Sequence, residues 1–487
     1  MSGNEPRTGT NLSQDRVARH QCELARQLEN AGDYDGARSA LGDLWPGLGH
    51  RPVVAGLDPN TKAELLLRVG SLAGWLGSTQ QTSSAQEFAK DLITESARIF
   101  ASLGQQEKAA EAQTDLGICY WRAGAVDEAT VWFGEALSRA TEVQNRVRIL
   151  INQAIIEIFS NRLDEALELL NQAAPLLARI DDHATHGRYH MQRAIAFKRR
   201  GGPDNLDRAL IENAAASFHL EQANHTRYVA RVENNIACIF MEFQRYDDAV
   251  EHLSKALQVF STLDDSGSVA QVNETRARVF LAKERYADAE QAAAAAVEIL
   301  QRGDEQSLLA EALGTQGIAF AKLGRYQEAL DTLSRSAEVA ERAGDRVTAG
   351  RTRLIMVEQL QHYLAPPELF KFYLEADESI GDMPDAETVK RLRVASRMAI
   401  AAAQRALGRS VEDLLTGGSL REEVRRYEGE LIKRAMDESQ GQITSAARML
   451  GITHQGLCEM LKSRHQNLRV KPPRSRQRTS QNTETID

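Results

Sequence analysis

The sequence predicts an all-α fold, in which a long array of paired helices is followed by a small C-terminal helical domain. Two observations predict this fold. Sets of small and hydrophobic residues recur about every 40 residues through the middle of the chain. Residues 441–464 have the side-chain sizes expected of two crossed helices joined by a tight turn. The distribution of charge supports the same division into two parts. Residues 419–487 carry 13 Lys and Arg against 9 Asp and Glu and are therefore net positive, whereas the whole chain has a net charge of −9.

Each repeat in the array is marked by an alanine, a hydrophobic residue four places later and a small residue seven places later. Complete and partial sets begin at Ala129, Ala166, Ala209, Ala249, Ala289 and Ala329. Twelve places before most of these alanines lies another small residue: Gly117, Ala154, Ala237, Ala277 or Gly317. Small residues let two helices approach closely, so each unit is predicted to be a pair of antiparallel helices.

Turn residues support this pairing, since Gly32-Asp33-Tyr34 and Gly324-Arg325-Tyr326 fall between the two helices of a pair. With these features the array resembles the tetratricopeptide repeat family, most strongly over residues 105–345. The resemblance implies a right-handed α-solenoid of helical hairpins. A period of about 40 exceeds the family's usual 34 residues, which implies longer helices and is similar to the sensor arrays of bacterial regulators. Weaker pairs near 20–45 and 62–103, and a divergent pair with a closing helix over 346–408, extend the array.

In this family the first helix of each pair lines a concave groove. Three consecutive first helices carry an arginine and an amide one helical turn apart: Arg148 and Asn152, Arg188 and Gln192, Arg231 and Asn235. These pairs predict a cationic row beside groups that can hydrogen-bond a peptide backbone. The resemblance implies an extended peptide or an acidic protein segment as the ligand. The alternative is that the arginines pair with acids on neighbouring helices and only make the groove soluble.

The C-terminal segment shows the features of a helix-turn-helix. Ala446 and Ala447 are small where two helices cross, Gly451 permits a sharp turn, and Thr453 can cap the second helix. At these residues the segment resembles the DNA-binding end of the Fis-type family, and residues 419–438 resemble the long helix that precedes it there. The resemblance implies double-stranded DNA as a partner, contacted by Thr444, Ser445, Thr453, His454, Gln455, Cys458, Lys462 and Arg464.

Some recognition-helix residues depart from the family pattern. His454, Cys458, Glu459 and Met460 stand where members of the family often carry arginine, lysine or threonine. A carboxylate directed toward a phosphate-lined groove is unfavourable, so Glu459 argues against strong DNA binding. The alternative interpretation of the segment is a helical module that binds protein.

The long helix over 419–438 carries an apolar stripe at three- and four-residue intervals: Leu420, Val424, Tyr427, Leu431 and Ala435. The stripe predicts either a homodimer, whose two recognition helices would enter successive major grooves, or packing against the helix-turn-helix of the same chain.

The predicted order of domains is a disordered N-terminus (1–14), the repeat array with its capping helix (15–408), a glycine-containing hinge (409–418), the helix-turn-helix domain (419–465) and a basic disordered tail (466–487). The longest apolar run, 292–297, is too short to cross a bilayer, so no membrane contact is expected. Four scattered cysteines without a CxxC pair indicate a reducing cytoplasm.

The sequence contains no GxxxxGK, GxGxxG, HExxH or GxSxG motif, so neither an enzyme nor a cofactor is expected. His183, His186 and His190 share one side of a predicted helix, but no matching ligand cluster stands out elsewhere, and no metal is expected. The predicted function is a cytoplasmic DNA-binding transcriptional regulator whose array binds a peptide or protein. The alternative is an interaction scaffold whose helix-turn-helix no longer binds DNA.

Overall fold

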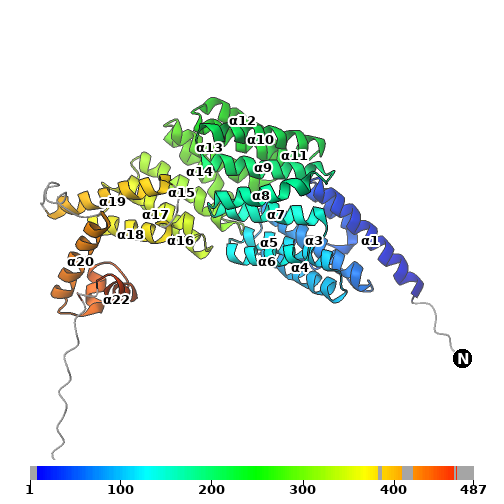
Figure 1. Ribbon diagram of the computed structural model, residues 1–487, viewed down its shortest axis with the longest axis horizontal. Helices are drawn as coiled ribbons and strands as arrows, with labels where there is room; N and C mark the ends of the chain where they lie inside the picture. The colour runs from blue at the N-terminus through cyan, green and yellow to red at the C-terminus, as the bar shows by residue number, and fades with distance from the viewer. Residues whose placement is uncertain (1–7, 382–385, 408–419, 466–467, 469–487) are drawn as a thin grey trace, which may run out of the picture. The chain divides into compact units, whose positions relative to one another are not determined.

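The computed structural model describes residues 8–381, 386–407, 420–465 and 468, and every regular element within these ranges is a helix (Figure 1). The helices in order are α1 (Thr8–Asn30), α2 (Tyr34–Leu41), η1 (Gly42–Leu44), α3 (Pro59–Gln80), α4 (Ala85–Ser102), α5 (Gln106–Arg122), α6 (Val126–Arg139), α7 (Val143–Phe159), α8 (Leu163–Leu177), α9 (His183–Arg200), α10 (Pro203–Gln222), α11 (Thr226–Glu242), α12 (Tyr246–Thr262), α13 (Ser266–Ala282), α14 (Tyr286–Leu300), α15 (Gln306–Lys322), α16 (Tyr326–Arg342), α17 (Arg346–Leu360), α18 (Pro366–Ile380), α19 (Ala386–Leu407), α20 (Leu420–Glu438), α21 (Ile443–Met449) and α22 (His454–Ser463).

The chain divides into two compact units, Met1–Ile355 and Met356–Asp487. The first unit holds the hairpins from α1 to α16, and the second holds α18, α19 and the three C-terminal helices. The predicted hinge 409–418 lies outside the described residues, as does the predicted tail except for Leu468. None of the helices described here has the length and hydrophobicity needed to cross a membrane.

The small residues identified in the repeats are the points at which the two helices of a hairpin meet. All six leading alanines are 0 % exposed on second helices. A Cβ added to Gly117 of α5 would lie 2.6 Å from the ring of Phe133 on α6, and one added to Gly317 of α15 would lie 2.5 Å from Leu333 on α16. Each small residue therefore accommodates the large residue that follows the leading alanine by four places. The predicted solenoid of helical hairpins is confirmed.

The second hairpin, α3 and α4, contacts a turn that is far away along the sequence, the turn before α15. The Gln81 side-chain amide donates to the Glu305 carboxylate at 2.8 Å. The backbone N–H groups of Ser84 and Gln86 donate to the Asp304 carboxylate at 2.8 and 3.1 Å. These bonds join the turn between α3 and α4 to the turn before α15, and so close one side of the concave surface.

The N-terminal helix is longer than the sequence suggested. α1 begins at Thr8, within the stretch 1–14 that was predicted to be disordered. Ala18, Cys22 and Ala25 of this helix are buried in the first unit, and the polar residues before them continue the same helix. Composition alone marked the segment as disordered because residues 1–14 are mostly polar.

The C-terminal helices share a small core. Ile432, Ala435 and Met436 of α20 pack against the buried residues of α21 and α22, which are Ala446, Ala447, Leu457 and Leu461. Ala435 of the predicted stripe therefore packs within its own chain, which is the second of the two partners considered for the stripe. Leu431 lies outside this core cluster and is half-buried.

Candidate ligand groove and nucleic-acid interface

A cavity of about 360 Å³ opens on the concave side of the first unit. Its lining comes mainly from the first helices of successive hairpins: α3, α5, α7, α9, α11, α13 and α15. Successive first helices lie side by side in a solenoid, so residues at equivalent positions form rows across this surface.

Five of the six residues predicted for the groove line this cavity: Asn152, Arg188, Gln192, Arg231 and Asn235. The sixth, Arg148, does not, because its guanidinium forms an ion pair with the buried carboxylate of Asp115. A buried carboxylate needs a compensating charge, and Arg148 supplies it. For this one arginine the alternative interpretation, pairing with an acid on a neighbouring helix, is what the structure shows.

Arg188 and Arg231 are placed differently from Arg148. Their guanidinium carbons lie 6.0 and 5.3 Å from the ring centroid of Tyr228, and Arg188 Nη2 donates to Asn152 Oδ1 at 3.3 Å. Within the described parts of the chain, neither arginine forms an ion pair with a carboxylate. The two cations therefore remain available to an anionic ligand.

The charge of these arginines acts on Tyr228. Burial alone would raise the pKa of the Tyr228 hydroxyl, but the nearby cations Arg188, Arg231 and Arg122 outweigh burial and lower the pKa below its ordinary value. A field that favours a phenolate also favours a carboxylate at the same place. The cavity is therefore suited to negative charge.

Several buried polar atoms lining the cavity have no hydrogen-bond partner in the described protein: Asn152 Nδ2, Arg231 Nε, Asn234 Oδ1 and Ser307 Oγ. Buried polar groups in folded proteins are nearly always satisfied, so these atoms call for water or a ligand. The set holds donors and acceptors together, which matches the alternating N–H and C=O groups of a peptide.

The aromatic part of the cavity was not predicted. Trp75 of α3, Trp121 of α5 and Tyr228 of α11 line it, and the guanidinium of Arg122 lies 3.7 Å from the ring centroid of Trp75. No local sequence signal marks these residues, because α3 belongs to a hairpin remote from α11 along the chain. Their place in the lining depends on the winding of the array.

In the C-terminal domain the turn and cap have the predicted geometry. Gly451 has a φ of +69°, which a residue with a Cβ adopts only under strain. Thr453 Oγ1 accepts a hydrogen bond from the Gly456 N–H at 3.0 Å and so caps α22.

The residues predicted to contact DNA lie on or beside α21 and α22. The exposed ones are Thr444, Thr453, His454, Gln455, Lys462 and Arg464, whereas Ser445 and Cys458 are half-buried. Glu459 is exposed on the same helix as Lys462, so the unfavourable carboxylate is on the surface, as the departure from the family pattern suggested. α22 therefore presents a polar face of mixed charge.

A buried pair that no local pattern of residues predicted lies at the end of α22. His465 Nε2 lies 2.9 Å from Glu428 Oε2, and the two residues are 5 % and 3 % exposed. Glu428 belongs to α20 and His465 directly follows the turn that ends α22. The pair ties the two helices together in the interior of the domain.

Comparison with known proteins agrees with the two parts of the fold. A tetratricopeptide repeat model matches residues 228–302 and 268–342, and a model described as a bacterial regulatory protein of the Fis family matches residues 423–462. No curated protein sequence matches the chain.

Solved structures with similar chain paths include a Rap protein complexed with competence and sporulation factor, at 13 % identity, 70 % coverage of this chain, 99 % of that chain and a TM-score of 0.49. The apo form of the quorum sensor NprR from B. thuringiensis has 14 % identity, coverages of 68 % and 97 %, and a TM-score of 0.40. Yeast Tom70 has 14 % identity, coverages of 81 % and 84 %, and a TM-score of 0.42.

The family models cover residues 228–342, which are part of the repeats on which the resemblance was based, and residues 423–462 of the C-terminal helices. The chain contains tetratricopeptide repeats and a C-terminal helix-turn-helix domain of the Fis family.

Proposed function

We propose that the protein is a cytoplasmic transcriptional regulator that binds double-stranded DNA through α22 and an extended acidic peptide or protein segment in the groove of the array. Both modules are of kinds that typically serve regulation and interaction rather than catalysis. The observation that carries the proposal is the state of the groove: Arg188 and Arg231 have no carboxylate partner among the described residues, and unsatisfied polar atoms line the same cavity.

The ligand inferred from the groove has defined chemistry. Carboxylates would meet Arg188 and Arg231, and the peptide backbone would meet Asn152 and Asn234. The aromatic rings of Trp75 and Trp121 offer a surface for an apolar side chain. Glu305 and Glu311 on the α15 side of the cavity would favour a basic group or a free amino terminus there.

DNA binding is supported by the exposed polar face of α22 and by the net positive charge of residues 419–487. Lys462 and Arg464 can meet phosphates, and His454 and Gln455, in the first turn of the helix, can meet base edges. Glu459 on the same face would weaken binding and restrict the sequences accepted.

The DNA part is tested by selecting bound sequences from random duplexes and then measuring affinity against salt for the full chain and for residues 1–418. A regulator predicts an enriched motif, and an affinity that falls steeply with salt and is lost on truncation. If no motif is enriched and truncation leaves binding unchanged, the protein is the alternative, a scaffold whose helix-turn-helix binds protein.

We also propose that the protein binds DNA as a homodimer. Leu431 of the α20 stripe is half-buried and lies outside the core cluster of the domain, and in this proposal its exposed part packs against a second copy. Sedimentation of the protein on the selected duplex tests this: a 2:1 complex is expected, and a 1:1 complex on a duplex of two helical turns would contradict it.

A further inference from the structure

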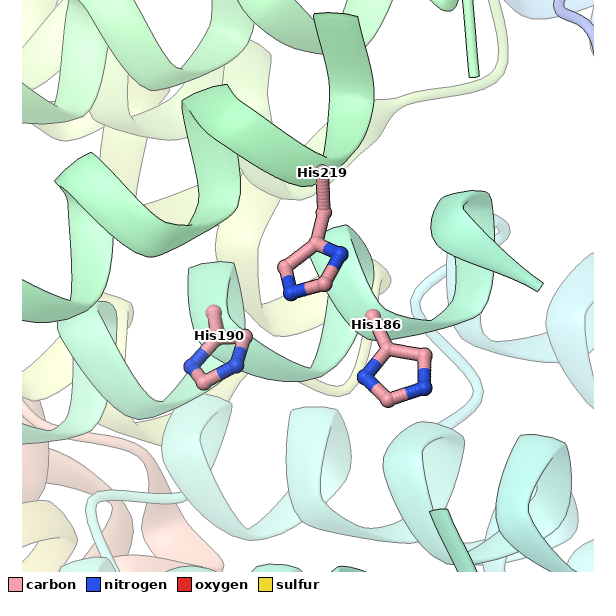
Figure 2. A group of neighbouring side chains, drawn as sticks. All are labelled: His186, His190 and His219. Atoms are coloured by element: carbon pink, nitrogen blue, oxygen red, sulfur yellow. The ribbon is translucent and has the colours of Figure 1, made fainter. Parts of the chain in front are cut away.

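Four histidines gather where α9 packs against α10. His183, His186 and His190 lie on α9, and His219 comes from α10. Figure 2 shows the ring of His219 lying between those of His186 and His190. One ring nitrogen from each of these three residues can be chosen so that all three atoms lie within 4.8 Å of one another.

One nitrogen of each ring is already held by a protein group. His186 Nε2 lies 2.9 Å from the carbonyl oxygen of Ile180, and His190 Nδ1 lies 2.7 Å from the Glu212 carboxylate. His219 Nδ1 lies 2.8 Å from His183 Nδ1. The carbonyl and the carboxylate accept, so they leave Nδ1 of His186 and Nε2 of His190 with a lone pair for a metal ion. In the tautomer in which His219 Nδ1 donates to His183 Nδ1, Nε2 of His219 has a free lone pair as well.

This pattern is the one that metal-binding histidines show. A ligating histidine almost always bonds through its other nitrogen to a carboxylate, a backbone carbonyl or another polar group, which fixes the tautomer and the direction of the ring. Glu212 is itself held by Arg193 at 2.8 Å, so its position is fixed as well. The supporting groups expected around a three-histidine site are therefore present.

The geometry allows a small ion to be bound. Tetrahedral zinc with metal–nitrogen bonds of about 2.0–2.1 Å holds its ligand atoms roughly 3.4 Å apart. The rings of His190 and His219 are stacked at 7° with centroids 5.6 Å apart, so binding an ion requires the rings to turn until their lone pairs point to one place. All three rings are half-buried at the surface of the hairpin, which leaves room for such side-chain rotations. Imidazole ligands without thiolates or additional carboxylates favour zinc, copper or nickel over calcium or magnesium.

We propose that His186, His190 and His219 form a binding site for a zinc-like transition-metal ion, with the fourth position open to water. The site does not depend on the proposed groove ligand or on DNA binding. It joins α9 to α10, and α9 also carries Arg188 and Gln192 of the groove. A bound ion would hold this hairpin in one arrangement and so restrict the shape of one groove wall.

The test uses tag-free full-length protein, freed of metal by chelation and titrated with CoCl₂ at pH 7.5. We expect one equivalent of Co²⁺ to bind with the visible absorption of a tetrahedral ion, and ZnCl₂ to displace it. His219→Ala should raise the Kd at least ~100-fold, because it removes a direct ligand. The matched control is His252→Ala, since His252 also bonds a carboxylate through Nδ1, that of Glu233 at 2.6 Å, but stands apart from the cluster. The control should bind Co²⁺ as tightly as the natural protein.

Helical circular dichroism and the melting temperature show whether each variant is folded. If His219→Ala fails to fold, His186→Gln takes its place, because glutamine at this half-buried site keeps a polar side chain but does not replace the imidazole. The proposal is overturned if the natural protein gives no tetrahedral Co²⁺ absorption, or if the folded cluster variant binds Co²⁺ as tightly as the His252→Ala control.

Discussion

The groove of the array and the helix-turn-helix domain are built from residues at very different separations along the chain. The core of the C-terminal domain joins residues between Ile432 and Leu461, and its turn and cap depend on Gly451 and Thr453 alone. The groove places Trp75 of α3 in the same cavity as Glu311 of α15. Changes in the groove should therefore act through the winding of the whole array, whereas changes in the C-terminal domain should remain local.

The largest expected effect concerns His225, next to the groove. Burial, together with the nearby Arg188, Arg231 and Arg227, lowers the pKa of His225 from 6.5 to about 3. In the unfolded chain His225 is protonated below pH 6.5, whereas in the folded chain it stays neutral until the pH falls to about 3. The contribution of His225 to the free energy of unfolding is therefore highest above pH 6.5. It decreases as the pH falls, by about 3 kcal/mol between pH 7 and pH 4.

Denaturant unfolding at the two pH values measures this loss. Because carboxylates also titrate in this range, the decisive quantity is the difference between the natural protein and His225→Asn. His225 Nδ1 accepts from the Tyr228 N–H at 3.3 Å, and asparagine can accept at the same helix start without titrating. The variant should lose less stability on acidification, and an identical loss would show that His225 does not titrate as its burial implies.

The next effect tests the two groove arginines that line the cavity, Arg188 and Arg231. Arg188→Ala with Arg231→Ala should weaken binding of an acidic peptide, selected from a library on the natural protein, by about 10- to 100-fold, because charge-assisted hydrogen bonds are lost. Fluorescence anisotropy with the labelled peptide measures the Kd. Arg302→Ala with Arg335→Ala is the control, since it removes the same charge from exposed positions that do not line the cavity. Equal affinities of the two double variants would remove the groove from the proposed function.

A smaller effect tests the contact between helices within a hairpin. A Cβ at Gly317 would lie 2.5 Å from Leu333, whereas a Cβ at Gly134 of α6 would have no atom within 4 Å. Gly317→Ala should cost about 1–3 kcal/mol through overpacking. Gly134→Ala should stabilise by about 0.5–1 kcal/mol, because alanine is the better helix former. Chemical denaturation compares them, and the same sign for both would contradict the small-to-large pairing of the repeats.

The smallest effect is confined to the C-terminal domain. If the exposed Lys462 of α22 contacts a phosphate, Lys462→Ala should flatten the slope of log affinity against log salt by roughly one unit. Lys255→Ala, an exposed change on α12 of the array, should leave the slope unaltered. A slope that changes equally in both variants would mean that DNA does not distinguish the two parts of the molecule.

The hairpins and the C-terminal turn were predictable because their signals are local. A small residue in one helix and a large one in the next are separated by a fixed number of residues, as Gly317 and Leu333 are. The direction of the groove residues followed from the same periodicity, and five of the six predicted residues line the cavity. Arg148 was the exception, since no rule of spacing indicated that Asp115 would be buried beside it.

By itself, the sequence determined the helical periodicity, the hairpin pairing and the helix-turn-helix, because each depends on residues within one or two helices of one another. Only the tertiary structure decided which side chains meet across the array. Asp304 accepts a hydrogen bond from the second hairpin, Trp75 lines the groove, and His219 lies beside His186 and His190. The physical reason is that each hairpin is rotated slightly relative to the one before it, and these rotations add up along the solenoid. No local pattern of residues specifies the total rotation between two distant hairpins.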